Sequence, residues 1–259
     1  MFLSTLLIDT GGNPDRPRPG RLWLRNLYRV HQRLCMAFPC STRRRSDQMF
    51  LMPYAPSDFA QAHVHVERGP DAGFLFRVDP QSGGGAVIIV LSALPPDWEY
   101  AFRNAAHLLA APLQEPRHLH LDIAAGEQFR FRLLANPTKR PALNKDERLR
   151  RTAAGQKVNR PRQQLTWDPN DSPNAAFNKW LERRAAVCGF NLRAVEVSRV
   201  GYVYINKGRD STQARRLRSV QFDGLLAVTD ANIFLHTLAH GIGPGKAFGF
   251  GLLSIAPAG

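Results

Sequence analysis

Two residues with proton-transfer chemistry, Tyr28 and His31, stand three positions apart in a segment of helical periodicity. Residues at this spacing lie on one face of a helix. Histidine exchanges a proton near neutral pH because its ordinary pKa is about 6.5, whereas a phenol, with a pKa of about 10, is a hydrogen-bond donor. The pair fits acid–base chemistry, and the alternative is a half-buried tyrosine beside a surface histidine.

A second chemical feature is the stretch from Gly241 to Gly251, which contains five glycines together with Lys246. Glycine adopts positive φ and lets the backbone approach a ligand, so that N–H groups and a lysine can hold an anion such as phosphate. We expect Gly243, Gly245 and Lys246 to form such a site. The alternative is a tight turn before a last buried strand.

Composition narrows the class of partner. The 259 residues carry a net charge of +14, which is the balance expected of a protein that holds a polyanion. Nucleic acid is the first expectation and an anionic membrane surface the second. Only three cysteines occur, without metal-binding spacing, so we expect no metal site, no cofactor and no disulfide framework. Without a signal peptide or an apolar run of membrane-spanning length, we expect a cytoplasmic protein.

The elements that must position these residues follow from periodicity. In the first half we expect a strand at 2–8, one helix at 21–37, strands at 74–78 and 86–91, and a helix or turn from Asp97 towards Leu109. Asp97 is the expected N-cap of that last helix. Strand, helix, two strands and helix is the beginning of a ferredoxin-like unit. Segment 40–72 is expected to be an insertion or a lengthened hairpin.

The second half repeats this order. We expect a strand at 128–134, a helix at 177–187, strands at 194–205 and 219–228, a helix that Asp230 caps and that runs through Leu238, and a last strand after the glycine stretch. The basic segment 139–162 between them is expected to be a loop. The predicted fold is therefore α+β, with two tandem ferredoxin-like (RRM-like) βαββαβ domains at 1–122 and 123–259.

The connection between the strands at 194–205 and 219–228 is rich in cations. We predict a hairpin with a basic tip, and such hairpins fit a stem-loop RNA better than a single strand because duplex RNA offers phosphates and shape. The residues predicted to bind RNA there are Lys207, Arg209, Arg215, Arg216 and Arg218. For any one arginine, the alternative is a solvated position at a strand edge.

Several motifs in the same order resemble the CasE family, the CRISPR repeat-RNA endoribonucleases of type I-E Cascade. They lie at 1–4, 28–31, 126–139, 220–230 and 241–251, nearly from end to end of the chain. The resemblance implies that His31 is the catalytic histidine with Tyr28 beside it. It also implies that the basic hairpin, Lys139, Lys157 and the glycine stretch bind the repeat RNA.

By the same resemblance, the protein cleaves CRISPR repeat RNA to 2′,3′-cyclic phosphate and 5′-hydroxyl ends and stays on its product with the other Cascade subunits. RNA carries its own nucleophile, the 2′-hydroxyl, so this chemistry needs a base, an acid and cations but no metal. We expect a monomer when the protein is isolated. The competing hypotheses are a non-catalytic RNA-binding subunit and a DNA-binding scaffold.

Two positions depart from the family pattern. Pro244 and Gly245 replace a basic residue and an alanine before Lys246, which removes a cation from the glycine stretch. Gln156, beside Lys157, replaces a basic residue at mid-chain. Both departures concern contacts with RNA, and neither changes Tyr28 or His31.

Overall fold

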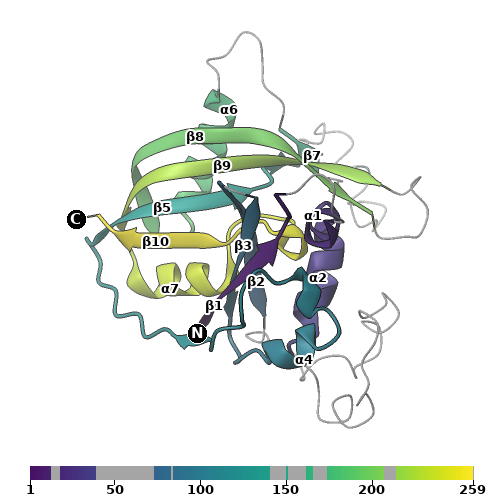
Figure 1. Ribbon diagram of the computed structural model, residues 1–259. Coiled ribbons are helices and arrows are strands. Elements are labelled where there is room, and N and C mark those ends of the chain that lie inside the picture. Colours follow the sequence, from purple (N-terminus) through teal and green to yellow (C-terminus); the bar gives the residue numbers. More distant parts are fainter. Residues whose placement is uncertain are drawn as a thin grey trace.

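The computed structural model shows two four-stranded antiparallel sheets, with helices packed on them (Figure 1). It describes residues 1–12, 18–38, 73–82, 84–140, 150, 162–165, 174–206 and 214–258. Segment 40–72 and three of the residues predicted to bind RNA, Lys157, Lys207 and Arg209, lie outside the described residues. No helix within the described part of the chain is long and apolar enough to cross a membrane.

The first sheet is formed by the N-terminal half of the chain. Its strands are β1 (Phe2–Asp9), β2 (Phe74–Gln81), β3 (Gly85–Ser92) and β4 (Arg117–His118), in the order β2-β3-β1-β4. Between β1 and β2 lie α1 (Pro19–Leu24) and α2 (Leu27–Cys35), and between β3 and β4 lie α4 (Trp98–Phe102) and the 3₁₀ helix η2 (Ala106–Leu108). The chain order and strand order are those of a ferredoxin-like unit.

The second sheet has the same plan. Its strands are β5 (Gln128–Ala135), β8 (Phe190–Ile205), β9 (Arg215–Val228) and β10 (Leu253–Pro257), in the order β10-β5-β9-β8. Helix α6 (Ala175–Ala185) follows β5, and α7 (Ala231–His240) with the 3₁₀ helix η4 (Lys246–Phe248) precedes β10. Two short strands, β6 (Thr138–Lys139) and β7 (Gln163–Gln164), pair separately. The predicted tandem ferredoxin-like fold is confirmed, and the boundary at 122 stays a prediction.

One predicted helix is in fact two. Instead of a single helix over 21–37, α1 ends at Leu24 and α2 begins at Leu27. Asn26 causes the break, because it is extended (φ −120°, ψ 93°) and its side chain accepts a hydrogen bond from the backbone N–H of Tyr28. Asparagine favours this N-cap role over the helix interior. The predicted caps Asp97 and Asp230 are confirmed, since they accept from the N–H groups of Tyr100 and Ile233.

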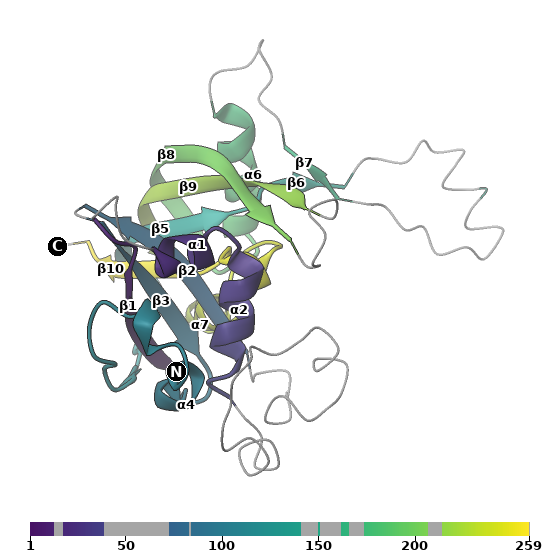
Figure 2. The same cartoon turned by 45° about the vertical axis from the view of Figure 1, so that its right-hand side comes forward.

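The basic hairpin also differs from the prediction. Arg215, Arg216 and Arg218 belong to β9 and not to a connecting tip, because β8 and β9 stay paired out to Ile205 opposite Arg215. Two register shifts in β8, at Leu192/Ala194 and Val197/Arg199, bend this pair. The paired ends of β8 and β9, residues 202–205 and 215–218, are called the basic arm. They extend from the sheet towards α1 and α2 (Figures 1 and 2).

Each sheet has its own apolar core, and a third cluster joins the two halves. This cluster contains Leu75 of β2, Leu91 of β3 and Leu252 before β10. Beside it, the buried Arg77 donates to both oxygens of Asp79 at 2.8 and 2.9 Å and to Ser254 Oγ of β10 at 2.8 Å. A buried guanidinium requires such partners, so this contact fixes the two sheets against each other.

The glycine stretch requires its glycines for the fold. Gly249 has φ +76°, and a Cβ there would lie 3.3 Å from Phe76 and 3.4 Å from Leu27. Gly126 has φ +92°, but a Cβ there would meet nothing within 4 Å. Valine at either position carries backbone strain of about 1–3 kcal/mol, and only at Gly249 does it also collide with the N-terminal half.

We therefore expect Gly249→Val to lower the melting temperature clearly more than Gly126→Val does. Thermal unfolding of both variants followed by circular dichroism measures the difference. Equal losses would show that the contact of Gly249 with Phe76 and Leu27 tolerates a side chain.

Candidate active site and nucleic-acid interface

Helix α2 places Tyr28 and His31 at the edge of the first core. Leu27, Val30 and Leu34 are buried against that core, so the helix cannot rotate about its axis without exposing them. Tyr28 and His31, one helical turn apart, are each half-buried. The predicted pair is therefore brought to one place on a fixed element.

The ring of His31 is held by aromatic stacking. Its centroid lies 5.3 Å from Phe74 and 6.3 Å from Phe76, with interplanar angles of 28° and 19°. Its Nε2 lies 3.5 Å from Cys35 Sγ, one turn further along α2. A loose surface histidine would have no such neighbours. The ring orientation is defined by packing, as proton transfer at a fixed substrate atom requires.

Tyr28 connects α2 with the glycine stretch. Its ring centroid lies 6.3 Å from that of Phe248 in η4. Burial, followed by repulsion from Cys35, raises the pKa of the Tyr28 phenol above its ordinary value. The phenol therefore keeps its proton at neutral pH and is a hydrogen-bond donor, not a base.

All five glycines between 241 and 251 have positive φ, from +73° to +92°. Several N–H groups of this stretch are used internally: Gly241 donates to Thr237, Ile242 to Gly251 and Gly251 to Leu134. The N–H groups of Gly243 and Gly245 donate to no acceptor among the described residues. These are the two amides predicted to face an anion.

Lys246 begins η4, and its side chain is exposed. Desolvation by neighbouring atoms lowers the pKa of its ammonium, against an opposing influence of Cys188. η4 packs against both α2 and β2. The structure thus brings the glycine stretch and the Tyr28–His31 face together from opposite ends of the sequence.

The basic arm has an aromatic centre that sequence reasoning missed. Guanidinium carbons of Arg216 and Arg218 lie 4.2 and 4.8 Å from the ring centroid of Tyr202 on β8. Arg218 also donates to Tyr202 Oη at 2.6 Å. Gln164 of β7 holds the neighbouring backbone, since it donates to Arg216 O and accepts from Arg218 N. The sequence pattern that could have indicated this cluster is the alternation of Tyr202 and Tyr204 in a predicted strand next to a segment rich in arginine.

Asn26 connects the basic arm with the start of α2. Its Nδ2 donates to Asn206 O at 2.9 Å, and its Oδ1 accepts from Asn206 N at 3.4 Å and from Tyr28 N at 3.2 Å. Asn206 directly follows β8. One side chain therefore fixes both the start of α2 and the end of a basic-arm strand.

Two further residues predicted to bind RNA lie outside the cluster around Tyr202. Arg215 is exposed at the end of β9, and Lys139 is exposed on β6. Arg132 on β5 is paired with Asp223 at 2.6 Å. Burial opposes ionisation of Asp223, but hydrogen bonds from Ser198, Gln221 and Arg132 outweigh it and hold the pKa of that carboxyl below its usual range.

Comparison with known proteins gives consistent matches over the whole chain. A model of the family described as CRISPR associated protein matches residues 1–257. The CRISPR-associated endoribonuclease Cse3 of Thermus thermophilus is 32% identical over 195 residues, which cover 71% of this chain and 79% of that protein. The CRISPR system Cascade subunit CasE of Escherichia coli is 27% identical over 261 residues, covering 99% of this chain and all of that one.

A solved structure of the CRISPR endoribonuclease Cse3 bound to a 19-nucleotide RNA is also similar. It superimposes with a TM-score of 0.66 at 28% identity, and the match covers 99% of this chain and 100% of that chain. The matches confirm the resemblance drawn from the sequence motifs: this chain belongs to the CRISPR associated protein family and is a relative of CasE.

Proposed function

We propose that the protein is an endoribonuclease that binds the stem-loop of CRISPR repeat RNA and cleaves the RNA in the cytoplasm without a metal. The observation that carries the proposal is the position of His31: a histidine fixed by stacking stands beside a protonated tyrosine, at the contact between α2 and a glycine stretch with open amides. The names and RNA-bound structure of the relatives support the substrate class.

In the proposed reaction the 2′-hydroxyl attacks the adjacent phosphate and the 5′-oxygen leaves. This gives a 2′,3′-cyclic phosphate and a 5′-hydroxyl. The 2′-hydroxyl loses a proton in this step and the leaving 5′-oxygen takes one up. His31 is the proposed proton carrier, since a histidine ordinarily exchanges a proton near neutral pH. Tyr28 donates a hydrogen bond near the 2′-hydroxyl or the phosphate, and Lys246 with the amides of Gly243 and Gly245 stabilises charge on the phosphate oxygens.

The basic arm is proposed to grip the RNA stem. Arg216 and Arg218 are oriented by Tyr202, and Arg215, Lys207 and Arg209 extend the cationic surface in our proposal. After cleavage the protein stays on the mature RNA as a subunit of Cascade, which is the assembly named for the CasE relative. If the wild-type protein binds repeat RNA but does not cleave it, the alternative of a non-catalytic RNA-binding subunit is favoured instead.

The first prediction concerns His31 and the nucleophile. His31→Ala should lower the single-turnover cleavage rate about 10²–10⁴-fold, the loss typical of a general acid or base, and leave RNA affinity nearly intact. Repeat RNA with one 2′-deoxy nucleotide at the cleavage site should bind and resist cleavage. Cleavage is followed on denaturing gels with EDTA present, and affinity is measured by filter binding.

Cleavage of the deoxy substrate would contradict attack by the 2′-hydroxyl, and an unchanged rate in His31→Ala would remove the histidine from the mechanism. Tyr28→Phe serves as the graded comparison. It keeps the ring against Phe248 but lacks the hydroxyl, so its loss should be smaller than that of His31→Ala.

The second prediction concerns Lys246. Lys246→Ala removes a charge-assisted contact of about 1.5–3 kcal/mol, so affinity or cleavage rate should fall roughly ten- to a hundredfold with an unchanged melting temperature. Because desolvation lowers the pKa of Lys246, the ammonium loses its proton at a lower pH than an ordinary lysine. The advantage of the wild type over Lys246→Ala in binding should therefore shrink as pH rises towards about 10.

Arg117→Ala is the matched control, because Arg117 is exposed on β4 and is not part of this site. If both variants bind and cleave like the wild type, the glycine stretch is only a turn before β10.

The third prediction treats Asn26 as a positioning residue. Asn26→Ser keeps an N-cap hydroxyl for Tyr28 N but cannot hold both backbone groups of Asn206. We expect the single-turnover rate to fall about tenfold at saturating RNA, since the arm and α2 are no longer held together. Asn26→Asp, which keeps the acceptor but not the donor, should fall between Ser and wild type.

Asp230→Ala is the control for helix stability, because it removes the N-cap of α7 and costs about 0.5–2 kcal/mol. If Asp230→Ala slows saturated cleavage as much as Asn26→Ser does, the effect of Asn26 is general stability and not positioning.

A further inference from the structure

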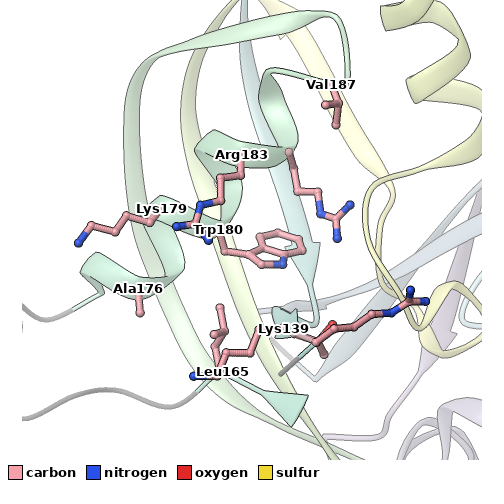
Figure 3. A pocket seen from close by; sticks show the side chains of 10 residues that line it. Lys139, Leu165, Ala176, Lys179, Trp180, Arg183 and Val187 are labelled. Atoms are coloured by element: carbon pink, nitrogen blue, oxygen red, sulfur yellow. The ribbon is translucent and has the colours of Figure 1, made fainter. Parts of the chain in front are cut away.

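A groove outside the proposed active site runs between α6 and the short strands β6 and β7. It has a volume of about 620 Å³ and an apolar floor of Leu165, Ala176, Trp180 and Val187 (Figure 3). A second hollow of about 290 Å³ shares Thr138, Arg140 and Arg184 with it and adds Arg162. The two form one continuous surface beside α6.

The groove is lined by five cationic side chains. They are Lys139, Arg140, Lys179, Arg183 and Arg184. None of them forms an ion pair within the described part of the chain. Lys179 and Arg183 are four residues apart on α6 and so lie on one helix face. Like charges gathered on one face repel one another, and a bound polyanion would relieve that repulsion.

Trp180 joins the groove to the glycine stretch. Its ring is packed on Phe222 and carries Arg184 at 5.7 Å, and its far edge lies 3.1 Å from where a Cβ of Gly243 would stand. Its Nε1–H is buried and reaches no acceptor among the described residues. Trp180 therefore lines the groove and also lies close to Gly243 of the predicted phosphate site.

The groove is also continuous with the basic arm. Thr138 and Lys139 of β6 pair with Gln164 and Gln163 of β7. Gln164 in turn holds the backbone of Arg216 and Arg218. On two sides, then, the groove adjoins elements proposed to contact RNA.

We propose that this groove binds an unpaired segment of the same RNA, outside the nucleotides that react at His31. The cations take the phosphates, and the apolar floor takes the face of a base or a ribose. A base-paired stem presents no free base face, so the apolar floor favours an unpaired segment. This inference rests on the proposed RNA-binding function.

The test compares two double variants that each remove two exposed positive charges. Lys179→Gln with Arg183→Gln changes the groove, and Arg117→Gln with Arg130→Gln changes exposed arginines elsewhere. The probes are a CRISPR repeat RNA with its unpaired flanks and the same hairpin trimmed to its stem and loop. Filter binding at several salt concentrations gives affinity and salt dependence.

For the flanked RNA, the groove variant should bind about tenfold more weakly and lose about 0.7 of salt slope for each cation removed. The control variant should bind like the wild type. On the trimmed hairpin, the groove and control variants should be alike. Photocrosslinking of flanked RNA containing 4-thiouridine should label the peptide that contains α6.

Equal behaviour of the two variants on flanked RNA would overturn the inference, as would an equal loss on the trimmed hairpin. Unchanged RNA binding with lost binding of another Cascade protein would assign the groove to an acidic protein partner and also overturn it. If the wild type itself neither binds nor cleaves repeat RNA, the proposed function fails; if only the variants fail to differ, the groove inference alone is wrong.

Discussion

The close contact between the glycine stretch and the N-terminal half is the constraint on which the site depends. Phe76 of β2 lies between the two: its ring stacks near His31, and it would lie only 3.3 Å from a Cβ at Gly249. A fully buried aromatic ring cannot shift without opening a cavity. The distance from α2 to the glycine stretch is therefore set by packing. The same packing determines how Tyr28 and His31 are placed relative to that stretch.

Charge is used in two different ways in this molecule. Arg77 and Arg132 are neutralised by Asp79 and Asp223, so they hold the sheets and do not offer charge to a ligand. The cations of α6 and the end of β9 have no such carboxylate partners within the described residues. The net charge of +14 does not distinguish the arginines that pair with a carboxylate from the cations that do not, whereas the positions of the acidic residues do.

Much of the fold was predictable because it rests on local patterns. The alternation of apolar and polar residues predicted β5. The N-caps Asp97 and Asp230 correctly marked the starts of α4 and α7. Errors arose where a tertiary contact decides the local structure. Asn26 interrupts a helical pattern because its side chain also binds Asn206, 180 positions away. The arginines of β9 stay in a strand because Gln164 and Tyr202 support them from other elements.

The same contacts explain why the predicted pair, Tyr28 and His31, could be recognised in the sequence and its surroundings could not. Tyr28 and His31 are neighbours on one helix, so their spacing reports their proximity. The aromatic rings that fix His31 come from β2, and the glycines come from the end of the chain. Because the site is assembled from both sheets, its geometry exists only when the halves are docked. An RNA that contacted both halves, as we propose, would stabilise the docked arrangement, since a ligand that binds only the docked state shifts the equilibrium towards it.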